Sequence, residues 1–482
     1  MFFSKYYSKQ FLKNDPHLPI NLIFCFFPIS FILGSFIVNL NLVLFCFYGI
    51  YLLRSKILNS TFNLPIKIIF LFFFTLFLST ALSLIKSLYF DEYDSTNLDK
   101  LAKSILFFRF FLFLITIYFL SKFDILRFKY FLLTATFSSI LLALDVIYQH
   151  YFGFDMVGFK SLGHRNPGFF GDEAVAGGYL LRFGFFAIFF TILVFKNKNY
   201  TKFISTMIVI SILGTGLLFS GNRMPLILFI FGLFLIFLSN LKIKKILLLS
   251  LVVLSVLFKF IISSDESYKI YITSYYSSYI EEVENTFLTP FDINLFGGKG
   301  IRTWARTEKT DEEELVLGQK NTFYKDVKLR SSYLRFALAT LHTWKSNKIF
   351  GNGIKSFYTD CHKLSSDPNI RIEEDQFPDK INLLCSNHPH NYYFQILTTT
   401  GIVGLFITFL IGWSFLVLIF KNFKFIKKFN MTNVILLSVI ISFFLEMFPL
   451  RNTGSLYTTN NATYIILIGS IILSYKELLK LK

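Results

Sequence analysis

Charged residues are scarce in this chain of 482 residues: Asp, Glu, Lys and Arg make up only 16% of it, whereas 54% is hydrophobic, including 65 Phe. Soluble globular domains carry about 25% charged residues, so this composition excludes a water-soluble globule. The apolar residues gather in repeated runs of about 17–25 residues, the length that spans a bilayer as a helix. The sequence therefore predicts an all-α polytopic membrane protein.

We expect about twelve membrane-spanning helices, divided by one long segment of mixed composition. Nine spans fall in residues 1–263, a large loop covers 264–391, and three more spans fall in 392–482. The expected spans lie near residues 18–34, 36–53, 67–86, 104–120, 130–149, 176–195, 203–220, 224–238, 244–263, 392–420, 433–449 and 462–476.

A signal-peptide cleavage site is missing from the sequence, and cysteines are scarce. The first apolar run lacks a small-residue cleavage site, so we expect it to remain as an anchor. Only four cysteines occur, and two of them, Cys361 and Cys385, fall in the large loop. In an oxidising compartment they could form a disulfide, and two free thiols are the alternative.

Basic residues give the chain a net charge of +18, and their placement identifies its cause. They cluster in alternate short loops, which is the positive-inside pattern of a membrane protein. Both termini are therefore expected in the cytoplasm and the large loop outside, and anionic lipid headgroups explain the surplus better than nucleic acid does. The clusters are Arg54, Lys56 and Lys67; Lys122, Arg127 and Lys129; Lys196, Lys198 and Lys202; Lys242, Lys244 and Lys245; and Lys421, Lys424, Lys427 and Lys428.

Four charged residues inside the expected spans fall in the outer half: Arg109, Asp145, Arg182 and Glu446. Such residues are costly in hydrocarbon and usually mark a site. A transporter would place its binding groups near the midplane and show internal repeats, and neither is present in the sequence. The pattern predicts a cavity that opens to the outside only, and snorkelling of the individual side chains is the alternative.

Three more arginines are expected at the outer surface. Arg165 lies in a Gly- and Pro-containing loop after the fifth span, Arg223 ends the reversal Ser-Gly-Asn-Arg, and Arg451 follows the eleventh span. The planar fork of arginine suits diphosphate oxygens, so the set indicates an anionic lipid headgroup as ligand. For any one of them, interfacial anchoring is the alternative.

The most informative stretch is His388-Pro-His390-Asn391, where the large loop enters the tenth span. A histidine can accept a proton near neutral pH, so His390 is a candidate general base, with His388 able to share or replace it. The alternative is a simple loop turn that caps the span, since Asn is a good N-cap. Upstream, apolar spacing predicts a helix over 330–344, followed by a tight turn at Phe350-Gly-Asn-Gly353 rather than a phosphate loop.

With these residues in view, the chain resembles the O-antigen ligase and polymerase family of bacterial inner-membrane proteins. The most specific match is His390-Asn391, nine further residues, and then Gly401-x-x-Gly404. The Arg223 reversal, Arg330-x4-Arg335 and Phe-Gly-Asn-Gly353 also match. Leu405 follows the second glycine where ligases often have Gly, Thr or Val, so ligase and polymerase both remain open.

The resemblance implies a periplasmic transferase that moves a glycan from undecaprenyl diphosphate to the lipid A-core acceptor, with inversion and without metal or cofactor. It implies that His390 is the general base and that Arg223 and Arg330 hold the leaving diphosphate. Arg165, Arg182, His388, Asn391 and Arg451 are expected to support the site. A polymerase, a protein O-oligosaccharyltransferase and, from another class, a transporter or flippase are the alternatives.

Overall fold

The fold of the chain is helical throughout the residues that its computed structural model describes, which are 16–58, 60–89, 95–238, 243–264, 332–365, 385–422 and 430–474. Within these ranges two isolated bridges are the only β-type pairings. The helices are α1 (Leu18–Cys25), α2 (Phe27–Ile32), α3 (Ser35–Leu53), α4 (Ser55–Leu58), α5 (Leu64–Tyr89), α6 (Ser95–Lys122), α7 (Phe128–Phe152), α8 (Ala176–Val194), α9 (Asn199–Phe219), α10 (Arg223–Leu238), α11 (Lys244–Ser264), α15 (Ser332–Lys345), α16 (Ser356–Ser365), α17 (Tyr392–Asn422), α18 (Met431–Glu446) and α19 (Thr459–Leu473).

Eight helices of the described part are long and apolar enough to cross a membrane: α3, α5, α6, α7, α8, α9, α11 and α17. The apolar stretches at Leu18–Ile32, Arg223–Leu238, Met431–Glu446 and Thr459–Leu473 are shorter. The first of these is divided at Phe26, and Pro28, in the first turn of α2, lacks the N–H that a continuous helix needs. The predicted all-α membrane fold is confirmed, and the number of twelve crossings stays a prediction.

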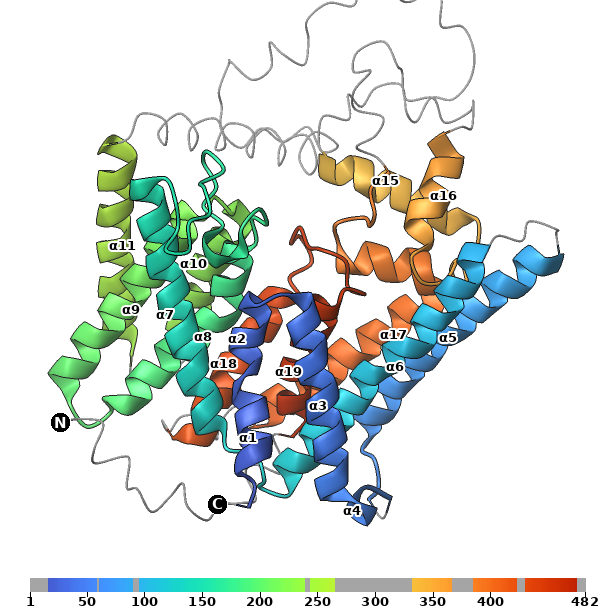
Figure 1. Ribbon diagram of the computed structural model, residues 1–482, viewed down its shortest axis with the longest axis horizontal. Helices are drawn as coiled ribbons and strands as arrows, with labels where there is room; N and C mark the ends of the chain where they lie inside the picture. The colour runs from blue at the N-terminus through green and yellow to red at the C-terminus, as the bar shows by residue number, and fades with distance from the viewer. Residues whose placement is uncertain are drawn as a thin grey trace, which may run out of the picture.

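The helices pack in three neighbouring groups (Figure 1). One group contains α7–α11, a second contains α5, α6 and α17, and the helices α1–α3, α18 and α19 lie between them. Aromatic rings fill much of the interior; the rings of Phe24 and Phe131, for example, lie 5.0 Å apart, and those of Phe27 and Phe113 lie 5.1 Å apart. Because lipid is as apolar as these side chains, such close packing, rather than the hydrophobic effect, holds the helices together.

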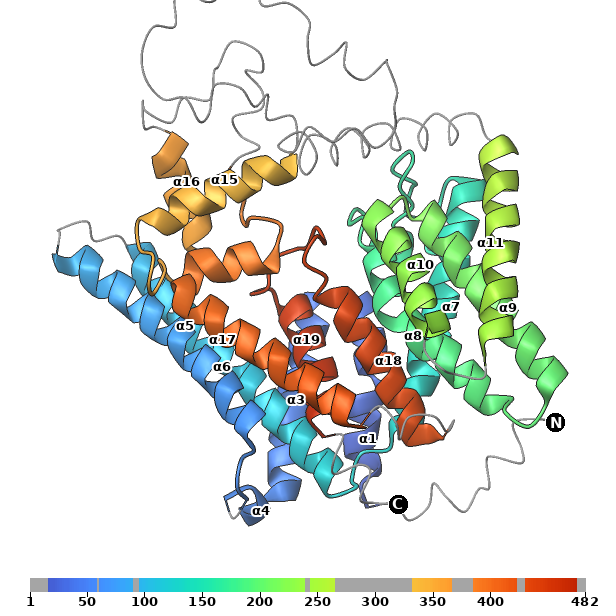
Figure 2. The same cartoon turned by 180° about the vertical axis from the view of Figure 1, so that it is seen from behind.

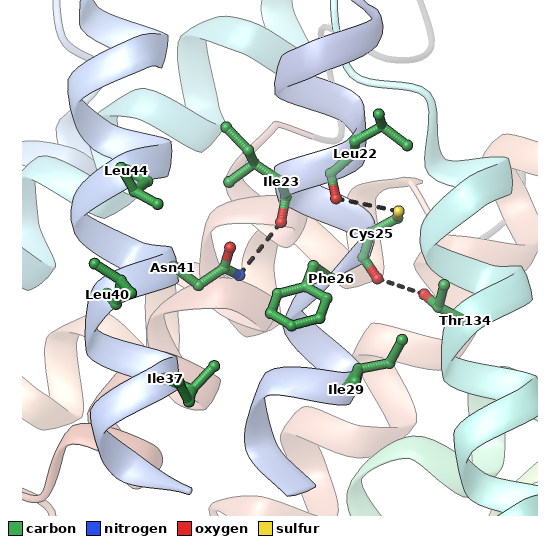
Figure 3. A pocket seen from close by; sticks show the side chains of 10 residues that line it. All are labelled: Leu22, Ile23, Cys25, Phe26, Ile29, Ile37, Leu40, Asn41, Leu44 and Thr134. Carbon is green, nitrogen blue, oxygen red and sulfur yellow. Dashed lines mark hydrogen bonds between the residues drawn. The ribbon is translucent and has the colours of Figure 1, made fainter. Parts of the chain in front are cut away.

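An apolar groove of about 460 Å³ lies between α1–α2 and α3 (Figure 3). Two of its polar side chains are bonded to the backbone: Asn41 Nδ2 donates to the carbonyl of Ile23 (3.3 Å), and Thr134 Oγ1 donates to that of Cys25 (2.6 Å). No charged side chain lines the groove. It therefore offers a hydrocarbon-like surface and no catalytic chemistry.

The predicted span 392–420 is not one continuous helix, because α17 is kinked at Gly401 (φ 63°, ψ −161°). In Figure 2 the part before the kink lies across the direction of the part after it. The confirmed turn at 350–353 packs against this kink, and Asn352 N and Gly353 N donate to the carbonyls of Thr398 and Thr399 (both 2.9 Å). A Cβ at Gly401 would collide with the carbonyl of Ile349. The glycine therefore permits the close approach of the loop that contains Ile349.

The large loop is described in two parts. The predicted helix over 330–344 is confirmed as α15, and a disulfide joins Cys361 of α16 to Cys385, with the Cα atoms 5.4 Å apart. Phe336 of α15 packs beside this disulfide, so α15, α16 and the segment before His388 form one small unit. Arg330 and the rest of the loop, residues 265–331 and 366–384, lie outside the described residues. We call the end of the bundle that carries this unit the His390 end.

Candidate active site

His390 occupies a left-handed turn just before α17. Its φ of 52° is uncommon for a residue with a side chain, and its carbonyl accepts a hydrogen bond from Thr453 N (2.8 Å). Asn391 holds the next position: its Nδ2 donates to the carbonyl of Pro449 (2.6 Å), and its Oδ1 accepts from Tyr393 N (2.9 Å). Asn391 is thus the helix cap, which leaves the imidazole of His390 free of that role.

The rings of His388 and His390 lie 4.2 Å apart, and the ring of Phe336 packs 4.9 Å from that of His390. Within the described residues, Nε2 of His388 is buried without a hydrogen-bond partner. Burial, helped by the neighbouring charge of His390, lowers the pKa of His388 to about 4. Burial also lowers the pKa of His390, partly offset by the backbone of Thr453. Both rings are therefore neutral at pH 7, which is the form that can accept a proton.

Two of the expected arginines meet at one carboxylate. Glu446, at the end of α18, is 1% exposed. Its Oε1 accepts from Arg182 Nη2 (2.6 Å) and Tyr392 Oη (2.8 Å), and its Oε2 accepts from Arg182 Nε (3.0 Å) and Arg451 Nη1 (2.6 Å). We call Arg182, Glu446, Arg451 and Tyr392 the ion cluster. A buried carboxylate with four donors is well satisfied, and the cluster keeps a net charge of +1.

The ion cluster links the helices around His390. Arg182 comes from α8, and its Nη2 also donates to Asn461 Oδ1 in the first turn of α19 (2.6 Å). Tyr392 is the first residue of α17, two residues after His390. Arg182 was expected in the outer half of a span and Arg451 at the outer surface; the structure engages both with Glu446, and the side chain of Arg182 is only 13% exposed. Their position indicates that they brace the site.

Arg165 and Arg223 are exposed and belong to one group of loops. Asn222 joins the reversal before α10 to the start of α8, since its Oδ1 accepts from Gly177 N (2.9 Å) and its Nδ2 donates to Ala174 O (2.9 Å). Arg165 packs against Gly221 in the same reversal. Within the described ranges, no hydrogen bond or ion pair joins Arg165 or Arg223 to His390.

The other charged residues expected in the outer half divide into two environments. Asp145 is fully buried, and its Oδ1 accepts from Met156 N (2.8 Å), so it braces the loop after α7. Arg109 reaches Thr459 at the start of α19. Sequence reasoning noted Glu446 as a charge but did not select it as a site residue. Its charge, opposite to that of Arg182, and its place in the outer half of a span were the signals that could have paired the two residues.

Potential cofactor ligands are dispersed: in the described residues, no three His, Cys, Asp or Glu side chains come together in a way that could hold a metal ion. The groups gathered near His390 are instead neutral imidazoles and guanidiniums. This arrangement can accept a proton and can stabilise negative charge, which are the two needs of a group transfer with an anionic leaving group.

Residues 208–409 of the chain match the protein family described as O-antigen ligase. The matched segment includes Arg223, the turn at 350–353, His390 and the kink at Gly401. No curated protein sequence matches the chain significantly. This segment of the chain is thus similar to the O-antigen ligase family, and the similarity agrees with the helical membrane fold.

Proposed function

We propose that the protein is a glycosyltransferase that moves a glycan from undecaprenyl diphosphate to the lipid A-core acceptor of lipopolysaccharide. The observation that carries the proposal is His390, a neutral imidazole held in a fixed turn by Thr453 and Asn391 beside the cationic ion cluster. The basic loops favour cytoplasmic termini, so the His390 end would face the periplasm of a bacterial inner membrane.

In this reaction His390 takes the proton from an acceptor hydroxyl while the hydroxyl oxygen attacks the anomeric carbon of the donor. The new bond forms as the bond from that carbon to the diphosphate oxygen breaks, so the configuration inverts. The leaving diphosphate takes the electron pair, and Arg223 and Arg330 neutralise its charge, which arginines can do in place of a metal. His390 then releases its proton to solvent.

The remaining residues have supporting roles in this proposal. Asn391, Arg182 and Arg451 fix the start of α17 through their bonds to Pro449 and Glu446. His388 packs on His390 and shields it from water. Arg165, beside the reversal that carries Arg223, adds positive charge on the approach of the donor.

The test offers the purified protein an undecaprenyl-diphosphate oligosaccharide, with lipid A-core in one tube and a second donor molecule in another. We expect transfer to lipid A-core; lengthening of the lipid-linked chain instead would identify a polymerase, the alternative that Leu405 keeps open. His390→Ala should abolish transfer, whereas His17→Ala, before α1, should retain it. Transfer by His390→Ala at the wild-type rate would refute the proposed base.

A further inference from the structure

Arg109 lies in the middle of the apolar helix α6, and among the residues that the structure describes it has no counter-ion. It lies six residues from Lys103 and thirteen from Lys122 within α6, so the nearest charged residue along the helix is about 9 Å away at 1.5 Å per residue. In the described part of the chain, no carboxylate forms an ion pair with it. Within the described residues its Nε is buried without an acceptor, its Nη2 makes one long contact with Thr459 Oγ1 (3.4 Å), and its guanidinium carbon lies 4.8 Å from the centre of the Phe110 ring. An arginine in this setting normally pairs with an anion.

Glu446 cannot supply that anion. Both of its oxygens are engaged, by Arg182, Arg451 and Tyr392, and it already neutralises one of those two guanidiniums. Arg109 therefore adds a further positive charge to the cluster's net charge of +1.

The two positive groups flank the same helix start. Arg109 contacts Thr459, the first residue of α19, and Arg182 binds Asn461 two residues further on. Thr458 caps this helix by accepting from Asn461 N (3.4 Å). The first turn of a helix carries partial positive charge from its N–H groups, so three sources of positive potential coincide here. Within the described residues, Glu446 is the only carboxylate that forms an ion pair with any of these groups.

This helix start lies at the His390 end of the bundle. The loop before α19 is bonded to both sides of the region: Thr453 N donates to His390 O, and Gln395 Nε2 of α17 donates to Ser455 Oγ (2.7 Å). Long side chains on a helix point toward its amino end, so Arg109 is directed from within the apolar part of α6 toward the level where lipid phosphates lie.

We propose that Arg109 and the first turn of α19 form a binding site for the phosphate of a lipid-linked substrate. If the proposed function holds, this ligand is the diphosphate of the polyprenyl donor, and Arg109 is an additional residue that binds it. The guanidinium would complete the pairing that its surroundings lack, with Nε and Nη2 donating to phosphate oxygens.

The test measures binding without requiring transfer. The purified full-length protein in lipid nanodiscs is titrated with undecaprenyl diphosphate, with neutral undecaprenol and with inorganic diphosphate, and the bound ligand is followed by native mass spectrometry. Arg109→Gln should weaken undecaprenyl diphosphate binding by roughly tenfold to a hundredfold, the value of a charge-assisted hydrogen bond. Binding of undecaprenol should not change. Arg109→Lys should bind undecaprenyl diphosphate more tightly than Arg109→Gln and more weakly than wild type.

Arg127→Gln is the matched control, because it removes one arginine from the loop between α6 and α7, where Arg127 is half-exposed beside Asp124. It should bind like wild type. Thermal unfolding without ligand checks folding, and Arg109→Gln should unfold close to the wild-type temperature. Among the described residues it breaks no ion pair and loses only the long contact with Thr459 and the contact with the Phe110 ring.

Equal binding of undecaprenyl diphosphate by Arg109→Gln and wild type would overturn the inference. Arg109-dependent binding of inorganic diphosphate or nanodisc phospholipid, with undecaprenyl diphosphate unaffected, would also overturn it as a substrate site. If the wild type binds undecaprenyl diphosphate through Arg109 but transfers no glycan, the site stands and the proposed function fails.

Discussion

Removing the charge of Glu446 should both destabilise the protein and displace the start of α17. Glu446→Gln keeps the size of the side chain but leaves Arg182 and Arg451 buried without a neutralising carboxylate. Loss of one partner of a buried ion pair costs about 3–5 kcal/mol. We therefore expect a clear fall in the midpoint of chemical unfolding in detergent micelles, larger than for any other single substitution in the ion cluster.

Tyr392→Phe isolates the positioning effect from the loss of charge. It deletes only the hydrogen bond from Tyr392 Oη to Glu446 (2.8 Å) and leaves the other three bonds to the carboxylate in place. The free energy of unfolding should fall by about 1.5 kcal/mol, the lower end of the range for hydrogen bonds to charged groups. Because Tyr392 lies two residues after His390, we expect kcat for transfer to fall about tenfold while KM for the donor stays unchanged.

Tyr179→Phe is the matched control for this variant. Tyr179 is also buried, and its Oη bonds to Pro28 O (2.8 Å) and Ser138 Oγ (2.7 Å), away from α17. It should lose a similar amount of stability and keep the wild-type kcat. If Tyr392→Phe keeps the wild-type kcat as well, the ion cluster does not position α17. If Glu446→Gln unfolds at the wild-type midpoint, the stability argument is wrong too.

Three further outcomes follow from the site. Transfer activity should rise with pH through an apparent pKa below the ordinary value of 6.5 and level off above it, because burial lowers the pKa of His390; a midpoint above 6.5 would contradict this. Gly401→Ala should destabilise the protein and abolish transfer, since its Cβ would collide with Ile349, whereas Gly412→Ala, in open space, should be neutral in both assays. Cys361→Ser should lower the thermal midpoint and slow transfer, and reductant should do the same to wild type but not to the variant.

Apolar run length predicted the fold well, because a bilayer sets the length of a spanning helix regardless of its neighbours. The helix α15 and the turn at 350–353 could also be predicted, since apolar spacing and glycines are local signals. The kink at Gly401 could not be predicted, because the residues around it form one apolar run in the sequence. It depends on a loop some fifty residues earlier that supplies hydrogen bonds to Thr398 and Thr399.

The candidate site was predicted in part. His390 and Asn391 stand out by residue type and spacing, and the structure shows how Asn391 caps α17. The partners of Arg182 and Arg451 could not be derived, because pairing across helices 264 residues apart in the sequence depends on packing.

The spacing between Asn391 and Gly401 has a structural explanation. The nine intervening residues form one short helix, about 13.5 Å long at 1.5 Å per residue. Its first end is held by the bonds of Asn391 and Tyr392, and its last by the turn at 350–353. One extra residue would rotate the two ends by about 100° relative to each other, so both attachments could not be kept. The spacing therefore fixes the direction in which His390 faces, which a capping role alone would not require.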